Sequence, residues 1–259
     1  MPPGMKKSPP AKTVLPVIFL IDVSDSMSID SRIGSVNTAM QESIEALNDK
    51  MLSNTELEIH MNVLKFGCKG ECQCRWMYDE MSPLNAFIWE NLEAEDNTPL
   101  GKAYFELDSK LSRSGFLTSP SGSYAPVIIL ITDGRPNNRK EAEKGLKRLN
   151  TNSWFVNADR MAIGVGLGED DDTLFLDDFV RGCPNGRVFL EVSNAASLIS
   201  SIEGIVINSA MIGATRLRTG GDEQYQDGLD RIEEKGLEEP VPPSEEEEEG
   251  SGGIEEPQP

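Results

Sequence analysis

Two unbroken runs of large apolar residues constrain the fold of this chain more than any other feature. Residues 17–21 and residues 127–131 contain only Val, Ile, Leu and Phe, and each run is followed at once by polar residues. Strands that are covered on both faces, as in a parallel sheet, have this composition, whereas a strand with one wet face alternates. The sequence therefore predicts two central strands of a parallel sheet.

Further strands and helices are predicted around these two runs. Residues 161–165 and 187–190 are shorter strand candidates, and residues 58–63 alternate like a half-exposed strand near an edge. Apolar residues recur every three or four positions, as in helices, over residues 33–51, 100–111 and 198–206. This alternation predicts an α/β fold with a doubly wound, mostly parallel central sheet flanked by helices, in three α-β-α layers. Ligands of such folds bind beyond the carboxyl ends of the strands.

The charge balance excludes several classes of function. The 259 residues include 24 Lys and Arg against 44 Asp and Glu, which gives a formal net charge of −20. Proteins that bind nucleic acid or an anionic membrane need a basic footprint, so we expect neither kind of partner. The sequence shows no membrane span and no signal peptide, and its four cysteines do not resemble a secreted disulfide framework. We therefore expect a cytoplasmic protein.

Composition also predicts the domain boundaries. Residues 1–13 combine prolines with small and basic residues and are expected to form a flexible lead-in. The last 41 residues carry 15 acidic and two basic residues and few large apolar ones, a composition typical of disorder. We expect one folded domain over residues 14–210 and an acidic, disordered tail over residues 211–259. The tail is interpreted as solubilising, and the alternative is that its carboxylates dock onto the domain's own metal.

Side chains rich in oxygen follow both central strands. The candidate metal ligands are two carboxylates and three hydroxyls, namely Asp22, Ser24, Ser26, Thr98 and Asp133. If the two strands are neighbours, Asp22 and Asp133 face each other across the crevice. Thr98 lies between them in sequence, and we expect it to be the N-cap of a helix that Pro99 opens. Three loops are therefore expected to converge with oxygen donors.

The chemistry of these donors indicates a hard cation. Carboxylates and hydroxyls with no nearby His or Cys suit Mg²⁺, with Ca²⁺ or Mn²⁺ as alternatives, and make a poor zinc site. Mg²⁺ prefers near-octahedral coordination and keeps several waters. Five such side chains would fill most of a shell and leave one position open.

The order and spacing of these residues resemble the metal-ion-dependent adhesion site (MIDAS) of von Willebrand factor A (vWA) domains. The resemblance covers about residues 15–209 and consists of the Asp22-x-Ser24-x-Ser26 motif, then Thr98, then Asp133 followed by glycine. Residues 98–101, 131–136 and 162–166 are most similar to the bacterial TerY-like branch, which is associated with tellurite resistance. Asp25 departs from the pattern, because the family usually has glycine at this position.

The resemblance implies a protein interaction module that is not an enzyme. Ser24, Ser26 and Thr98 would contact the metal directly, and Asp22 and Asp133 would act mostly through bound water. A partner protein would supply a Glu or Asp side chain to the open position. For the TerY-like branch the resemblance further implies a tellurite-resistance or stress-response system, with a protein kinase and a PP2C-type phosphatase as partners.

Three alternatives stay open at this point. The first is a metal-dependent phosphatase or hydrolase with Asp22 or Asp133 as nucleophile, although such enzymes favour a second Asp where this chain has Ser24. The second is a vWA subunit of an AAA-type ATPase or chelatase complex. The third concerns the cysteines at positions 68, 72, 74 and 183, which could bind a soft metal, although a hairpin loop is the simpler interpretation of the first three.

Overall fold

One mixed β-sheet organises the part of the chain that the structure describes. The computed structural model describes residues 12–52, 54, 57–70, 73–118, 123–134, 136–167, 173–183, 186–189 and 195–219. Its strands are β1 (Thr13–Asp22), β2 (Leu57–Phe66), β3 (Cys74–Trp76), β4 (Ser82–Pro83), β5 (Val127–Thr132), β6 (Asp159–Gly164) and β7 (Arg187–Phe189). They are ordered β3-β2-β1-β5-β6-β7, with β4 also paired to β2. Only β3 and β4 run antiparallel to their neighbour among these described strands.

The two apolar runs are adjacent parallel strands at the centre of this sheet. The register pairs Val17 with Val127 and Ile21 with Ile131, and both runs are buried throughout. On its other side β1 pairs with β2 over its whole length. The prediction of two central strands covered on both faces is confirmed. Strand β2 alternates between buried and half-exposed residues over Leu57–His60, as predicted, and Lys65 near its end is also half-exposed. It is not an edge strand, because β3 and β4 pair with it on its other side.

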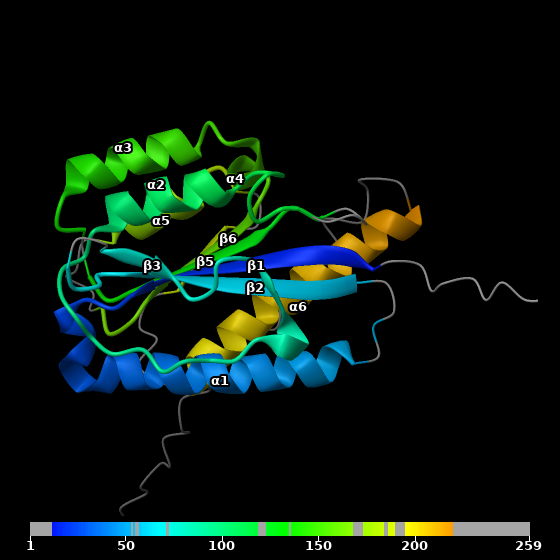
Figure 1. The fold of residues 1–259 in the computed structure, drawn as a ribbon, viewed down its shortest axis with the longest axis horizontal. Helices are drawn as coiled ribbons and strands as arrows, with labels where there is room; N and C mark the ends of the chain where they lie inside the picture. Colours follow the sequence, from blue (N-terminus) through cyan, green and yellow to red (C-terminus); the bar gives the residue numbers. More distant parts are fainter. Residues whose placement is uncertain are drawn as a thin grey trace, which may run out of the picture. The chain divides into compact units, whose positions relative to one another are not determined.

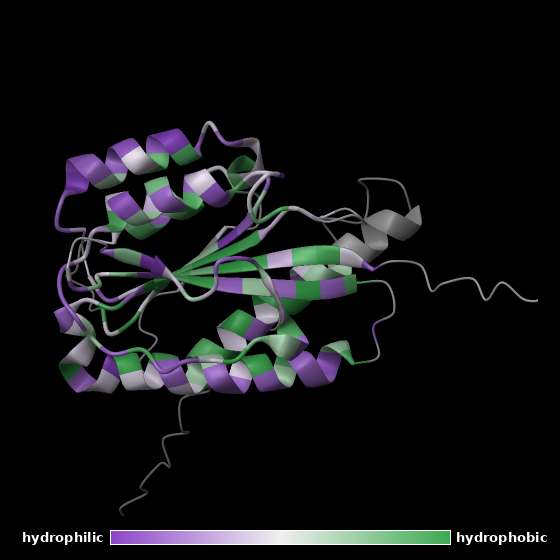
Figure 2. Cartoon of the chain, viewed as in Figure 1, coloured by the Kyte–Doolittle hydropathy of each residue, from purple (hydrophilic) through white to green (hydrophobic). Residues whose placement is uncertain are grey.

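Helices cover both faces of the sheet (Figure 1). The helices α1 (Arg32–Met51) and α6 (Ala195–Thr219) lie on one face, where Val17 and Phe19 of β1 join their core. On the other face lie α2 (Leu100–Lys110), α3 (Arg139–Leu149) and α5 (Leu174–Val180), which pack around Ile18 and Leu20, and the short α4 (Ser153–Val156). Figure 2 shows apolar strands between helices that carry hydrophilic residues on their outer sides. The predicted three-layer α/β fold is thus confirmed.

Both predicted boundaries of the domain lie close to the limits of the described residues. Helix α6 continues to Thr219, past the expected end of the domain at residue 210. Residues 1–11 and 220–259, which include most of the predicted lead-in and tail, lie outside the described residues. None of the described helices is long and apolar enough to cross a membrane.

Candidate metal centre

Backbone hydrogen bonds hold the loop that follows β1 against the end of β2 and against the segment that precedes Thr98. The N–H of Val23 donates to the carbonyl of Phe66 (2.9 Å), and the N–H of Glu95 donates to the carbonyl of Val23 (2.6 Å). Two residues after Val23 and one residue after Glu95, the N–H of Asp25 donates to the carbonyl of Asp96 (2.8 Å). The segment that leads to Thr98 is therefore held beside the loop that follows β1.

Gly67 makes this close packing of the loops possible. It follows β2 with φ +105°, a left-handed conformation that favours glycine. A Cβ at this position would lie 2.6 Å from the carbonyl oxygen of Asn97 and 2.9 Å from the backbone nitrogen of Ser24. A side chain at residue 67 would therefore push apart the segment that contains Asn97 and the segment that contains Ser24.

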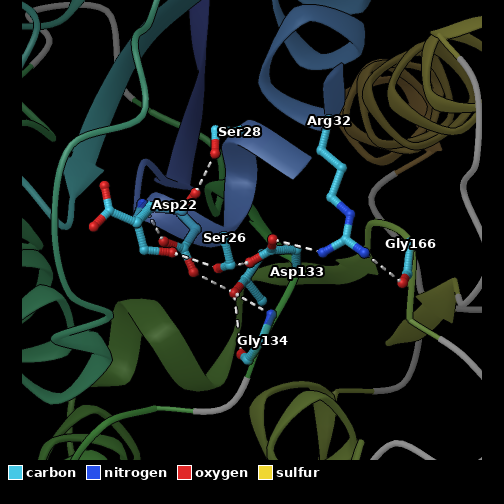
Figure 3. A network of polar contacts seen from close by, with 10 residues as sticks. Asp22, Ser26, Ser28, Arg32, Asp133, Gly134 and Gly166 are labelled. Atoms are coloured by element: carbon cyan, nitrogen blue, oxygen red, sulfur yellow. Dashed lines mark hydrogen bonds and ion pairs between the residues drawn. The ribbon is translucent and has the colours of Figure 1, made fainter. Parts of the chain in front are cut away.

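Three of the five predicted ligands form a hydrogen-bonded chain. The hydroxyls of Ser24 and Ser26 lie 3.1 Å apart, and the Ser26 hydroxyl donates to Oδ1 of Asp133 at 2.8 Å. Ser24 and Asp133 are buried, whereas Ser26 is half-buried. Figure 3 shows Ser26 and Asp133 pointing toward each other from the loops after β1 and β5. The structure thus joins residues that are far apart in sequence.

Asp22 lies next to this chain and is fully buried. Its carboxylate accepts hydrogen bonds from the N–H of Ser24 (2.8 Å) and from the hydroxyl of Thr132 (2.5 Å). Desolvation raises the pKa of Asp22 to about 7, and the nearby charge of Asp133 adds to the rise, while the Thr132 and Ser24 hydrogen bonds oppose it. A buried carboxylate in this setting favours a nearby cation.

The register shows a site residue that sequence reasoning missed. Because Ile21 pairs with Ile131, continuing the register places Thr132, and not Asp133, level with Asp22. Aligning the two five-residue runs with each other would have revealed this position. Thr132 then orients the Asp22 carboxylate, and Asp133 lies one residue beyond, where Ser26 reaches it.

Thr98 joins the same region through its backbone. Its carbonyl oxygen accepts from the N–H of Leu100 (3.0 Å) and from the N–H of Asn137 (3.1 Å), which follows Asp133 in the chain. The residue itself is 6% exposed. The predicted N-cap role is wrong, because α2 begins at Leu100 and the N-cap position belongs to Pro99. Thr98 instead connects the α2 loop to the loop after β5.

The site depends on hydroxyl groups as much as on carboxylates. Within the described ranges, no cluster of three or more His, Cys, Asp or Glu side chains is arranged to hold a metal ion. The side-chain hydrogen bonds connect two carboxylates, those of Asp22 and Asp133, with the hydroxyls of Ser24, Ser26 and Thr132. Hard dications accept such a donor set.

Comparison with known proteins identifies the family. The model of the von Willebrand factor type A domain matches residues 17–204. This chain belongs to that family. A search of curated protein sequences finds no match.

Several solved structures share the fold at low sequence identity. The pilus adhesin SpaC from Lactobacillus rhamnosus GG is 12% identical, with a TM-score of 0.57 over 77% of this chain and 31% of SpaC. Proximal thread matrix protein 1 from the mussel byssus, with a zinc-occupied MIDAS motif, is 14% identical over 76% of this chain and 46% of its own, with a TM-score of 0.51. The vWF domain of the pilus tip protein Mfa5 from Porphyromonas gingivalis is 12% identical over 76% of this chain and 96% of its own, again with a TM-score of 0.51. This chain thus spans less than half the length of SpaC and of the byssus protein, and these similarities show the fold.

Asp25, the departure from the vWA pattern, fits without strain. It begins a 3-10 segment, η1 (Asp25–Ser31), and is exposed. The described non-glycine residues with positive φ are instead Asp30 (φ 50°) and Ser31 (φ 56°), immediately before α1. Left-handed backbone at such residues costs roughly 1–2 kcal/mol each. The strain of this vWA loop thus lies at the start of α1 and not at Asp25.

Arg32 is a second residue that sequence reasoning missed. It is the first residue of α1, and its guanidinium forms an ion pair with Oδ2 of Asp133 at 2.8 Å. Nothing in the local sequence distinguishes Arg32 from an arginine on a solvated helix face. Only the folded arrangement places its charge on Asp133, one of the candidate metal ligands.

The three cysteines that the structure describes, Cys68, Cys74 and Cys183, do not gather into one soft-metal site. Cys68 and Cys74 lie on the β2–β3 hairpin, and Cys72 lies outside the described residues. Cys183 is near the opposite edge of the sheet, where its thiol donates to the carbonyl of Ala158 just before β6 (3.2 Å). Burial raises the pKa of Cys68 and raises that of Cys74 to about 12, which disfavours the thiolate form that binds metal.

Slow thiol chemistry should follow from this burial. In the folded protein at about pH 8, we expect Cys74 to react with iodoacetamide at least about tenfold more slowly than in concentrated urea, because the thiolate is the nucleophile. Mass spectrometry of timed samples gives the rate for each cysteine. Equal rates for Cys74 in the folded and unfolded chain would contradict the expectation.

Proposed function

We propose that this vWA domain binds a divalent cation through Asp22, Ser24, Ser26, Thr98 and Asp133. The hydrogen bond from Ser26 to Asp133 is the observation that carries the proposal, because it joins the loops after β1 and β5 at the carboxyl edge of a parallel sheet. Ligands of doubly wound folds bind at this edge.

The donors fit a cation of the Mg²⁺ class. Ser24 and Ser26 present neutral hydroxyls beside two carboxylates, and no imidazole or thiolate among the described contacts competes for the site. Asp22 receives its hydrogen bonds from neutral donors, so its buried charge gains from a nearby cation. Mg²⁺ is the proposed ion, with Ca²⁺ or Mn²⁺ as alternatives.

The proposed role of the bound ion is to dock an acidic side chain. A dication held mostly by neutral oxygens keeps enough positive charge to attract a Glu or Asp of a partner protein. We propose the TerY-like branch for this chain, with a protein kinase and a PP2C-type phosphatase of a tellurite-resistance or stress-response system as partners. The resemblance of residues 98–101, 131–136 and 162–166 supports this assignment. The module is proposed to act by binding, without an enzymatic activity of its own.

Cation binding is tested with Mn²⁺ as the probe. We expect Ser26→Ala to weaken Mn²⁺ binding at least about tenfold. The substitution removes both the hydroxyl oxygen that would bind the metal and the hydrogen bond that this hydroxyl donates to Asp133. Ser28→Ala is the matched control, since its exposed hydroxyl donates to the carbonyl of nearby Asp25. Electron paramagnetic resonance of free Mn²⁺ gives the affinities. Equal affinity in wild type and Ser26→Ala would rule out this site.

Partner docking is tested by affinity capture under matched conditions. We expect an acidic partner to be retained by wild type with Mg²⁺, and to be lost with Ser26→Ala or with a chelator. Ser28→Ala should retain the same partner. A set of captured proteins unchanged by the mutation and by the chelator would argue against docking through a metal. Mg²⁺-dependent hydrolysis of an aryl phosphate that disappears in Asp22→Ala would instead favour the enzymatic alternative.

A further inference from the structure

Arg32 connects three elements directly beside the candidate metal centre. From the start of α1 its Nη1 donates to Oδ2 of Asp133 at 2.8 Å, and its Nη2 donates to the carbonyl of Gly166 at 3.2 Å. Figure 3 shows Asp133 between Ser26 on one side and Arg32 on the other. The Arg32 side chain is 18% exposed and the Asp133 side chain is 0% exposed, so solvent screens this ion pair less than a surface pair.

The backbone around Arg32 leaves room for its guanidinium. Gly166 follows β6 with φ +64°, and a Cβ there would lie 2.5 Å from Nε, 2.9 Å from Cζ and 3.0 Å from Nη2 of Arg32. Only glycine allows the guanidinium to approach this loop so closely. On the main-chain side, Asp30 and Ser31 have left-handed backbone conformations immediately before Arg32, which is the first residue of α1. The arginine is therefore positioned by two unusual backbone segments.

The charge of Asp133 is compensated inside the protein. Its Oδ1 accepts from the hydroxyl of Ser26 and its Oδ2 from the guanidinium of Arg32. Asp22, by contrast, accepts from the neutral groups of Ser24 and Thr132. A cation at this site would thus face one carboxylate that is already paired with an arginine, Asp133, and one that is not, Asp22.

We propose that Arg32 is a positioning residue that lowers the cation affinity of this site. By pairing with Asp133, Arg32 cancels the negative charge of that carboxylate, so a bound dication receives less negative charge from the protein and attracts an incoming carboxylate more strongly. The inference rests on the cation site proposed above. It adds that the charge on α1, and not the ligands alone, sets how strongly the ion depends on an acidic partner.

The test compares Mn²⁺ affinity between charge-changing and charge-conserving variants of the full chain. We expect Arg32→Gln to bind Mn²⁺ about tenfold more tightly than wild type, because a repelling charge is removed from a partly buried site. Arg32→Lys, which keeps the charge, should stay within about twofold of wild type. If Arg32 only maintained the local structure, Arg32→Gln would bind more weakly and would melt at a lower temperature.

A second variant moves the guanidinium without altering residue 32. Gly166→Ala places a Cβ against Nε of Arg32, so it should displace the charge from Asp133 and also tighten Mn²⁺ binding. Circular dichroism verifies that each variant is folded at the temperature of the titration. If wild type binds Mn²⁺ and Arg32→Gln binds it equally well or more weakly, only this inference is overturned. Absence of Mn²⁺ binding in wild type overturns the proposed cation site and this inference with it.

Discussion

Asp22→Asn is expected to stabilise the metal-free protein while removing its cation binding. The Asp22 carboxylate is fully buried among neutral donors, and its pKa of about 7 against an ordinary 3.8 shows that the ionised form is unfavourable there. An asparagine has the same shape and can still accept from the Ser24 N–H. Removing the buried charge should raise the free energy of unfolding by about 2 kcal/mol at neutral pH. Without the carboxylate, Mn²⁺ binding should be lost.

The pH dependence of this gain has a definite sign. Between about pH 4 and pH 7 the unfolded chain has released the Asp22 proton while the folded chain still holds it. The unfolding free energy of wild type therefore falls over this window, relative to Asp22→Asn, and the difference between the two proteins is constant above it. Urea titrations in the presence of a chelator at several pH values measure this difference.

An exposed carboxylate supplies the control. Asp25→Asn makes the same change in charge three residues further along the chain. The Asp25 side chain is exposed, whereas that of Asp22 is buried. Its unfolding free energy should stay within about 0.5 kcal/mol of wild type. If Asp22→Asn destabilised the metal-free protein at neutral pH, the buried carboxylate would be stabilising, and the argument from desolvation would fail.

The fold was predictable where burial leaves a direct mark on the sequence. The runs that form β1 and β5 are apolar at every position because helices cover both faces of the sheet. Helix α3 was not predicted, because its buried face consists largely of Ala142 and Gly145, which carry little apolar signal. Helix α5 has seven residues, too few for a clear helical period.

The candidate ligands were predictable because their order along the chain matches a family pattern. Their supporting residues were not, since Thr132 and Arg32 reach the site only through strand register and the path of the chain before α1. The same limit explains the error at Thr98. A Thr-Pro pair is typical of a helix start, but here the Thr98 carbonyl is engaged by the Asn137 N–H of another loop.

Gly145→Ala should destabilise the domain strongly, although alanine is the better helix former. Helices α2 and α3 touch backbone to backbone, so a Cβ at Gly145 would lie 2.8 Å from the carbonyl oxygen of Gly101 and 2.9 Å from Cβ of Tyr104. These atoms cannot rotate away, so the helices must separate. We expect a loss of about 2–3 kcal/mol in the free energy of unfolding, measured by urea titration. The intrinsic helix preference for alanine, about 1 kcal/mol, acts in the opposite direction.

A glycine in an open helical position separates packing from propensity. A methyl group added at Gly204 of α6 would meet no atom within 4 Å, so Gly204→Ala should be neutral or should stabilise by up to about 1 kcal/mol. The two substitutions are chemically identical, and a similar effect of both would show that α2 and α3 are not in tight contact.

The same substitution at Gly145 should also affect the candidate metal centre. Because the Asn137 N–H donates to the Thr98 carbonyl, separation of the helices should also displace Thr98. Gly145→Ala is therefore expected to weaken Mn²⁺ binding even though it lies on α3, outside the set of ligands.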